Sequence, residues 1–251
     1  MLRTSLTELL HLTSAPVAIA FVDAAPPSVA HVAAVEPAGC GYWRRAAAGE
    51  VFFTIADDHK GCPVGAHTHN VTLSPAEEQE LMGLVQTMVG LSYIKMEDVP
   101  QIPRRKTPLR VAVYAPLSAA PVPPDVVLVR GNAQQLMLLA EAAQAAGVVG
   151  SGPAMGRPTC AVLPEAINSA RTATSFGCIG NRVYTGADDS EAYFAIPGAQ
   201  LGAVEESLVI IVRANQEFEK FHRGRAAATP TSSDSYKSSR QTVSASPDAR
   251  D

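Results

Sequence analysis

The residues of this sequence best suited to chemistry are its cysteines, because a thiolate can bind a metal or act as a nucleophile. There are four of them: Cys40, Cys62, Cys160 and Cys178. Each stands in or next to a turn rich in glycine or proline, in the segments GCG, GCP, RPTC and FGCIG. A structural cysteine behaves as a small apolar residue and more often lies inside a strand or helix. The shared loop setting therefore favours one common site.

Four thiolates can hold either a zinc ion or a four-iron cluster. The cysteines are 22, 98 and 18 positions apart, whereas structural zinc sites typically use closely spaced pairs. Ligands this scattered need a chain already folded around the metal. We therefore expect an iron–sulfur cluster of the 4Fe–4S type, used for electron transfer or for binding a small anionic ligand. Zinc, or no metal at all, is the alternative.

A second candidate metal site lies in one segment, where His59, His67 and His69 surround Cys62. Three histidines within eleven residues could bind a single metal ion. The same segment is compatible with a cysteine-dependent enzyme, in which Cys62 is the nucleophile and His59 or His67 the base. A third hypothesis is a non-redox module that binds a small metabolite and has structural cysteines or zinc. Whether the protein is an enzyme stays open.

Candidate ligand-binding residues stand near the glycine-bearing loops. Arg157 and Arg182 could clamp a carboxylate or phosphate, and Arg130 is a further candidate. Asn132 follows an expected strand and begins a helix, a setting in which an anion can sit on the helix N-terminus. The segment lacks the G-x-G-x-x-G fingerprint, so a helix cap also explains Asn132. No G-x-S-x-G, H-E-x-x-H or P-loop motif is present, which removes the main support for common hydrolase and ATPase functions.

Composition narrows the choice of partners. The 251 residues carry 20 Lys and Arg against 24 Asp and Glu, a net charge of −4 that does not attract nucleic acid. The longest apolar run, 15–22, is too short to span a membrane, and the interrupted N-terminal segment makes a poor signal peptide. We expect a cytoplasmic protein whose partner is a redox protein or a small anionic metabolite, with no nucleic-acid or membrane partner. A homo-oligomer is compatible with the sequence.

Strand and helix patterns alternate over residues 1–222. Runs rich in Val, Ile and Phe predict strands at PVAIAFVD, VFFTIA, LRVAVYAPL and DVVLVRG, the last three buried on both faces. Helical spacing predicts helices at TSLTELLHL, after Cys40, after Ser74, over 132–147, after Cys160 and over 198–222. These patterns predict an α/β fold, with mixed α+β as the alternative, in a single compact domain with a mixed sheet flanked by helices. The Ser- and Ala-rich segment 223–251 is expected to be a disordered tail.

The chain resembles the domain of unknown function 169 family of bacterial and archaeal proteins. The segments that carry the resemblance are LTELLHLTSAPVAIAF, EVFFTIADDHKGCPVGAH, PPDVVLVRGNAQQ, GRPTCAVLPEA, TSFGCIGNRVYTG and YFAIPG, in this order. The resemblance covers about residues 1–222 and implies a cytoplasmic protein of mixed α/β fold. It also implies that the loops of Cys40, Cys62, Cys160 and Cys178 form a shared site, without naming what that site binds.

Overall fold

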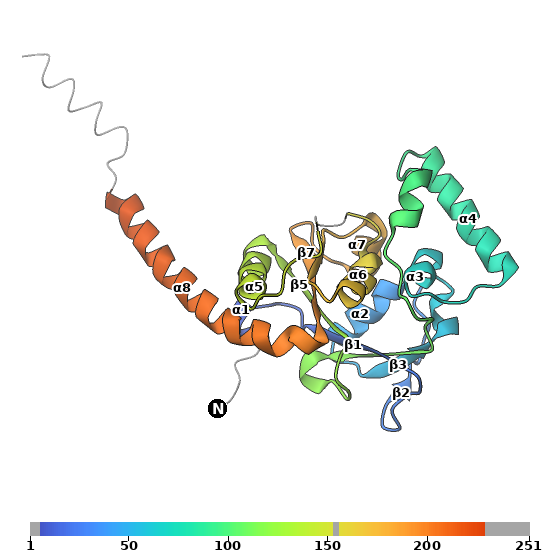
Figure 1. Ribbon diagram of the computed structural model, residues 1–251, viewed down its shortest axis with the longest axis horizontal. Coiled ribbons are helices and arrows are strands. Elements are labelled where there is room, and N and C mark those ends of the chain that lie inside the picture. The colour runs from blue at the N-terminus through green and yellow to red at the C-terminus, as the bar shows by residue number, and fades with distance from the viewer. Residues whose placement is uncertain (1–5, 153–155, 229–251) are drawn as a thin grey trace, which may run out of the picture. The chain divides into compact units, whose positions relative to one another are not determined.

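A seven-stranded mixed sheet organises the computed structural model of the protein, which describes residues 6–152 and 156–228 (Figure 1). The strand order is β2-β3-β4-β1-β5-β7-β6. The strands are β1 (Val17–Val22), β2 (Ala30–His31), β3 (Phe52–Ile55), β4 (Val111–Pro116), β5 (Val126–Asn132), β6 (Ala173–Ser175) and β7 (Glu191–Pro197). β2 pairs with β3 in parallel, and the other neighbouring strands pair antiparallel. The predicted mixed sheet is confirmed, and its antiparallel pairs place it nearer the α+β alternative.

Helices connect and cover these strands. The α-helices are α1 (Leu6–Leu10), α2 (Gly39–Ala47), α3 (Pro63–Thr68), α4 (Pro75–Gly90), α5 (Ala133–Ala145), α6 (Val162–Ser169), α7 (Ile179–Thr185) and α8 (Leu201–Ala228). Short 3-10 helices are η1 (Ala56–His59), η2 (Met96–Gln101), η3 (Leu117–Ala119), η4 (Thr159–Ala161) and η5 (Gly198–Gln200). The predicted start of α4 is confirmed by a capping box, in which Ser74 and Glu77 satisfy each other's backbone N–H groups.

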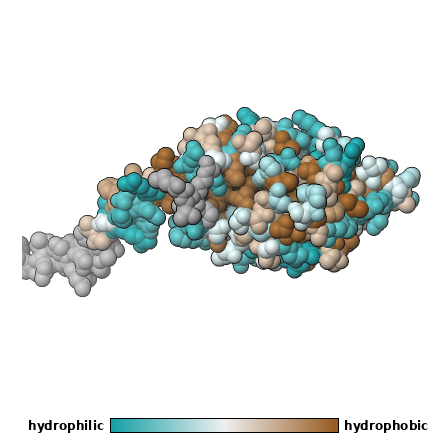
Figure 2. All heavy atoms as spheres, turned by 90° about the horizontal axis from the view of Figure 1, so that it is seen from below, coloured by the Kyte–Doolittle hydropathy of each residue, from teal (hydrophilic) through white to brown (hydrophobic). Residues whose placement is uncertain are grey.

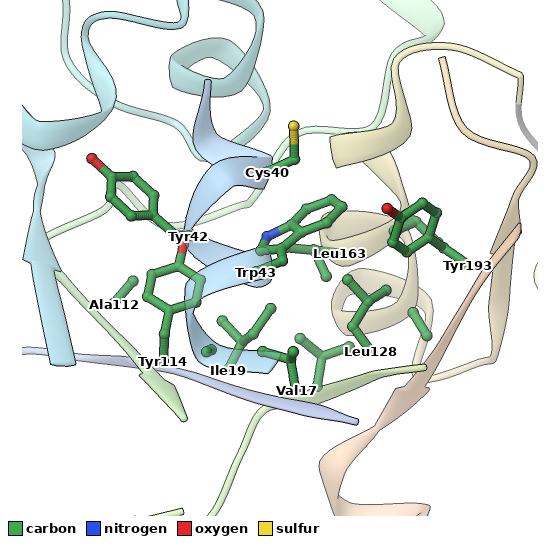
Figure 3. Close-up of a cluster of buried hydrophobic side chains, with 14 of the residues drawn as sticks. Val17, Ile19, Cys40, Tyr42, Trp43, Ala112, Tyr114, Leu128, Leu163 and Tyr193 are labelled. Carbon is green, nitrogen blue, oxygen red and sulfur yellow. The ribbon is translucent and has the colours of Figure 1, made fainter. Parts of the chain in front are cut away.

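The two faces of the sheet are both covered, because alternate residues of a strand point to opposite faces. On one face, Val17 and Ile19 of β1 join a hydrophobic core with Tyr42 and Trp43 of α2 (Figure 3). Next to these strands, α6 packs against β5, β6 and β7. On the other side of β5 and β7 lies α5, which packs against both strands (Figure 1).

One strand is more exposed than its apolar sequence suggests. All residues of β4 are buried, as expected for a central strand. In β3, by contrast, Phe53 is only partly buried and Ile55 is 38% exposed. The reason is position: β3 is bordered by the two-residue edge strand β2, which leaves one of its faces thinly covered. The expectation of burial on both faces was therefore wrong for β3 and right for β4.

The chain divides into two compact units, Met1–Ile210 and Ile211–Asp251, with the boundary inside α8. α8 continues to Ala228, past the end expected at His222, and the rest of the expected tail, 229–251, lies outside the described residues. Apolar and polar residues are interspersed on the face shown in Figure 2, as on most protein surfaces. Among the described residues, no helix combines the length and the apolar character that a membrane crossing needs.

Candidate functional site

The four cysteines all lie where a helix begins. Cys40 is the second residue of α2, and Cys62 and Cys178 are the N-cap residues of α3 and α7. Cys160 lies in η4, which leads directly into α6. The first N–H groups of a helix have no partner within the helix, and they favour negative charge nearby. The sequence predicted this setting for Cys40 and Cys160, and the structure adds the other two.

The structure brings the four thiols within electrostatic reach of one another. Burial, followed by the neighbouring thiol of Cys62, raises the pKa of Cys40 from 9.0 to about 12, and Cys178 contributes in the same direction. The pKa of Cys160 is raised by burial, by Cys62, and by Cys178 and Cys40. A charged group shifts the pKa of another only when the two lie close together. We call Cys40, Cys62, Cys160 and Cys178 the cysteine site.

Two close approaches hold the loops of the cysteine site together. The backbone N–H of Cys178 donates a hydrogen bond to the Thr159 hydroxyl, which ties the start of α7 to η4. Beside Cys62, glycine lets the starts of α2 and α3 meet: a Cβ at Gly65 would lie 3.0 Å from Cys62 Sγ and 3.9 Å from the backbone nitrogen of Gly39. The Gly65 N–H itself points at that sulfur, with an N to Sγ distance of 3.4 Å. Sequence reasoning noticed the glycine before Cys40 but not Gly65, and it could not show which loops the two join.

Sequence reasoning missed two polar neighbours of the thiols. Burial raises the pKa of both the Cys40 thiol and the Tyr193 hydroxyl, and the buried Asn181 side chain opposes both shifts, yet its amide atoms make no well-formed hydrogen bond. Burial likewise raises the pKa of Cys160, and the Thr68 hydroxyl opposes that rise. The available signal for Asn181 was its place three residues after Cys178, one turn into a helix. Figure 3 shows the Cys40 sulfur at the start of α2, pointing away from the strands below it.

Two of the three candidate histidines form a buried stacked pair. The rings of His59 and His69 have centroids 5.1 Å apart and planes 27° apart. His59 Nε2 lies 2.8 Å from Thr54 Oγ1, and His69 Nδ1 lies 2.9 Å from the Gly65 carbonyl oxygen. The remaining nitrogens, Nδ1 of His59 and Nε2 of His69, are buried without a partner. His67 lies half-buried on α3, where burial and then Arg104 lower its pKa.

Burial keeps this histidine pair neutral. It lowers the pKa of His59 well below 6.5, with His69 as a further cause, and it lowers the pKa of His69 to about 4. Within residues 6–152 and 156–228, no three or more His, Cys, Asp or Glu side chains are arranged to hold a metal ion.

The family assignment follows from the sequence as a whole. Residues 5–207 match the family DUF169, described as uncharacterised ArCR, and this span includes the entire cysteine site. The chain belongs to the domain of unknown function 169 family. No curated protein and no solved structure shows significant similarity to it. The DUF169 match thus confirms the resemblance seen in the motifs.

Of the candidate ligand-binding residues of this DUF169 protein, Arg130, Asn132 and Arg182 all neighbour Glu191. Arg182 donates hydrogen bonds to the backbone carbonyls of three residues, Phe176, Asp188 and Glu191. The Arg157 guanidinium lies 4.2 Å from the centre of the Tyr93 ring. Asn132 caps α5, its side chain accepting a hydrogen bond from the backbone N–H of Gln135 at 3.0 Å. Of the three candidate arginines, Arg130 borders a hollow of the protein surface.

The buried histidine pair predicts a loss of stability in mild acid. In the unfolded chain His69 takes up a proton near pH 6.5, whereas in the folded protein it does so only near pH 4. Stability from such a group is present above pH 6.5 and is lost as the pH falls towards 4. Between pH 7 and pH 5 we expect His69 alone to lower the free energy of unfolding by about 2 kcal/mol. His59 acts in the same direction.

Urea denaturation at several pH values measures this effect, with His69→Gln as the control. Glutamine keeps an amide donor for the Gly65 carbonyl but does not titrate. The variant should lose about 2 kcal/mol less than the natural protein between pH 7 and pH 5. Any metal released by acid affects both proteins, so the difference between their profiles isolates His69. Parallel profiles would show that His69 is protonated normally in the folded state.

Proposed function

We propose that this protein holds an iron–sulfur cluster, of the 4Fe–4S type, on the cysteine site. The observation that carries the proposal is the meeting of four helix starts: α2 packs against α3 and α7, α3 packs against η4, and each of these four elements has one of the cysteines at or near its start. Four isolated structural cysteines have no reason to converge, since they are far apart in the sequence and each fills a different loop. In this function the protein transfers electrons or binds a small anionic ligand.

The residue types of the site fit such a group, and its side chains would have to close around the metal, because they are not arranged as a metal site among the described residues. Cys40, Cys62, Cys160 and Cys178 would be its ligands, and thiolates are the ligands that iron–sulfur clusters use. Four thiolates bring a large negative charge into a partly buried site, and the unpaired N–H groups at the helix starts oppose that cost. When bound, the cluster would supply one-electron transfer. Asn181 and Thr68 lie beside two of the sulfurs, where hydrogen bonds adjust reduction potential.

The raised pKa values of the Cys40 and Cys160 thiols also help to compare metal binding with thiol catalysis. Thiols such as Cys40 and Cys160 stay protonated at neutral pH without a metal, and a protonated thiol is a weak nucleophile. Ligation would have to displace these protons, so metal binding should release acid. Thiol catalysis through Cys62 and a metabolite-binding module with zinc stay as alternatives. A reducing cytoplasm, the compartment proposed here, would keep all four thiols available.

Metal analysis under strict anaerobiosis tests the proposal. We expect about four iron and four acid-labile sulfide per chain, with a broad visible absorption, after purification or after incubation with ferrous iron and sulfide. Measuring zinc in the same samples distinguishes the cluster from the main alternative, a zinc ion bound by the same cysteines. A chain that retains zinc alone, or no iron after that incubation, would overturn the cluster and leave the zinc-bound or metal-free metabolite module.

A further inference from the structure

Asn181 is a buried amide in the cysteine site that lacks hydrogen-bond partners. It lies in the first turn of α7, three residues after Cys178, and α7 packs against α2, whose second residue is Cys40. Asn181 is 2% exposed, and neither Oδ1 nor Nδ2 of its side chain has a hydrogen-bond partner among the described residues. A buried polar group left unpaired costs about 1–3 kcal/mol, so a group of this kind calls for a physical explanation.

The nitrogen end of this amide faces two groups that can accept a hydrogen bond. Burial raises the pKa of the Cys40 thiol and of the Tyr193 hydroxyl, and the Asn181 side chain opposes both shifts. A side chain opposes such a rise by donating a hydrogen bond to the ionised form, and Nδ2 is the donor of asparagine. The oxygen end lies elsewhere, because a Cβ at Gly177 would be 3.4 Å from Asn181 Oδ1. Figure 3 shows the Tyr193 hydroxyl facing α2, the helix that carries Cys40.

The hydrogen bonds around Tyr193 make its hydroxyl an acceptor for Asn181. The Thr185 hydroxyl donates its one proton to the backbone carbonyl of Asn181, with an oxygen to oxygen distance of 2.8 Å. The Tyr193 oxygen lies 3.1 Å from Thr185 Oγ1, so Tyr193 must be the donor in that pair. Its lone pairs then remain available to the amide. One N–H of Asn181 is suited to Tyr193, and the second is suited to the sulfur of Cys40.

The second N–H gains a strong acceptor only when Cys40 binds a metal. The sulfur of a thiol is a weak hydrogen-bond acceptor, whereas a hydrogen bond to an ionised group is roughly twice as strong as one between neutral groups. Cysteine binds metals as the thiolate. The unpaired amide is therefore explained by a partner that forms on metal binding.

We propose that Asn181 is a positioning residue of the cysteine site, which donates one hydrogen bond to Tyr193 and one to the metal-bound sulfur of Cys40. The inference rests on the proposed function in needing a metal on the cysteines, but it does not depend on which metal they hold. Hydrogen bonds to the sulfurs help to set the reduction potential of an iron–sulfur cluster. An N–H donor stabilises negative charge on sulfur, so Asn181 favours the reduced state.

Titration of the metal-free protein with cobalt(II) tests the contact with sulfur without an iron–sulfur cluster, because cobalt bound to thiolates has its own visible and near-ultraviolet absorption. Asn181→Leu removes the amide donors and keeps a side chain of similar size. We expect this variant to raise the cobalt Kd about tenfold or more, since changes to residues that support a ligand typically cost about 10–100-fold in metal affinity. Cobalt affinity equal to that of the natural protein would overturn the inference.

Tyr193→Phe is the matched control, because it removes the other acceptor of Asn181 and keeps the amide and every sulfur. It should bind cobalt with nearly the natural affinity. Equal losses in Tyr193→Phe and Asn181→Leu would show that Asn181 only packs α7 in place, and would overturn its role at the sulfur. If Asn181→Leu does not fold, as judged by circular dichroism, the smaller Asn181→Ala replaces it with the same expected loss.

The reduction potential of protein loaded with iron and sulfide gives a second readout. Asn181→Leu should shift it to a more negative value and Tyr193→Phe should not, and an unchanged potential in Asn181→Leu would overturn the inference. The two proposals fail separately. A chain that takes up no iron but loses cobalt affinity in Asn181→Leu would reject the cluster and keep the role of Asn181. Iron uptake with no effect of Asn181→Leu would do the reverse, and a chain that binds neither metal would reject both.

Discussion

Cys160→Ser is expected to lose nearly all bound iron, together with the visible absorption. Cys160 lies in η4 and is coupled to the three other thiols of the cysteine site. A serine hydroxyl is harder to ionise than a thiol and is a poor ligand for the soft metals that thiolates select. Even changes to residues that only support a ligand typically cost about 10–100-fold in metal affinity. Removing a ligand itself should cost at least as much.

The same loss is expected for serine at Cys40, Cys62 and Cys178, measured as iron and sulfide per chain. Thr68→Val is the matched control, since it alters a neighbour of Cys160 and keeps every thiol. It should retain iron, with a shifted reduction potential as the main effect. Full iron in all four serine variants would reject the assignment.

A partial result would also be informative. Loss of metal confined to the Cys62 variant would favour the site predicted from His59, His67 and His69. Cys62→Ser would then cause the same loss of metal as substitution of these histidines. The two ligand sets are neighbours, since Gly65 contacts both the Cys62 sulfur and the His69 ring, so the pattern of metal loss across the variants is what distinguishes them.

Local sequence patterns predicted the elements of this fold well. The caps at Ser74 and Asn132 and the helices after Cys40 and Cys160 are all present, because each depends on neighbours within a few residues. Such local patterns could not predict the order of the strands in the sheet. β1 lies between β4 and β5, which follow it only after several other elements, so pairing across the sheet is set by tertiary packing.

The same distinction applies to the sites. The cysteines stood out by type and loop setting, but their convergence depends on how α2, α3, η4 and α7 pack. His59 and His69 looked like candidate ligands because, with His67, they place three histidines within eleven residues. Their burial follows from the aromatic packing of Tyr42, whose ring lies 5.1 Å from that of His59.

Gly198→Ala is expected to destabilise the fold severely. Gly198 ends the motif YFAIPG, directly after β7, and its N–H donates to the Asp125 carbonyl at 2.8 Å. A Cβ at this position would lie 1.7 Å from the carbonyl oxygen of Pro124. Backbone cannot swing aside as a side chain can, so β5 and β7 would have to separate at this end. We expect the free energy of unfolding to fall by more than about 3 kcal/mol.

Gly83→Ala serves as the control, because Gly83 lies in α4 with nothing within 4 Å of an added Cβ. Alanine favours a helix over glycine by about 1 kcal/mol, so this variant should be equal to or more stable than the natural protein. Urea denaturation of both variants measures the contrast. If Gly198→Ala proved as stable as Gly83→Ala, β5 and β7 would be free to part at their ends. The final glycine of the motif would then be explained by something other than this close approach.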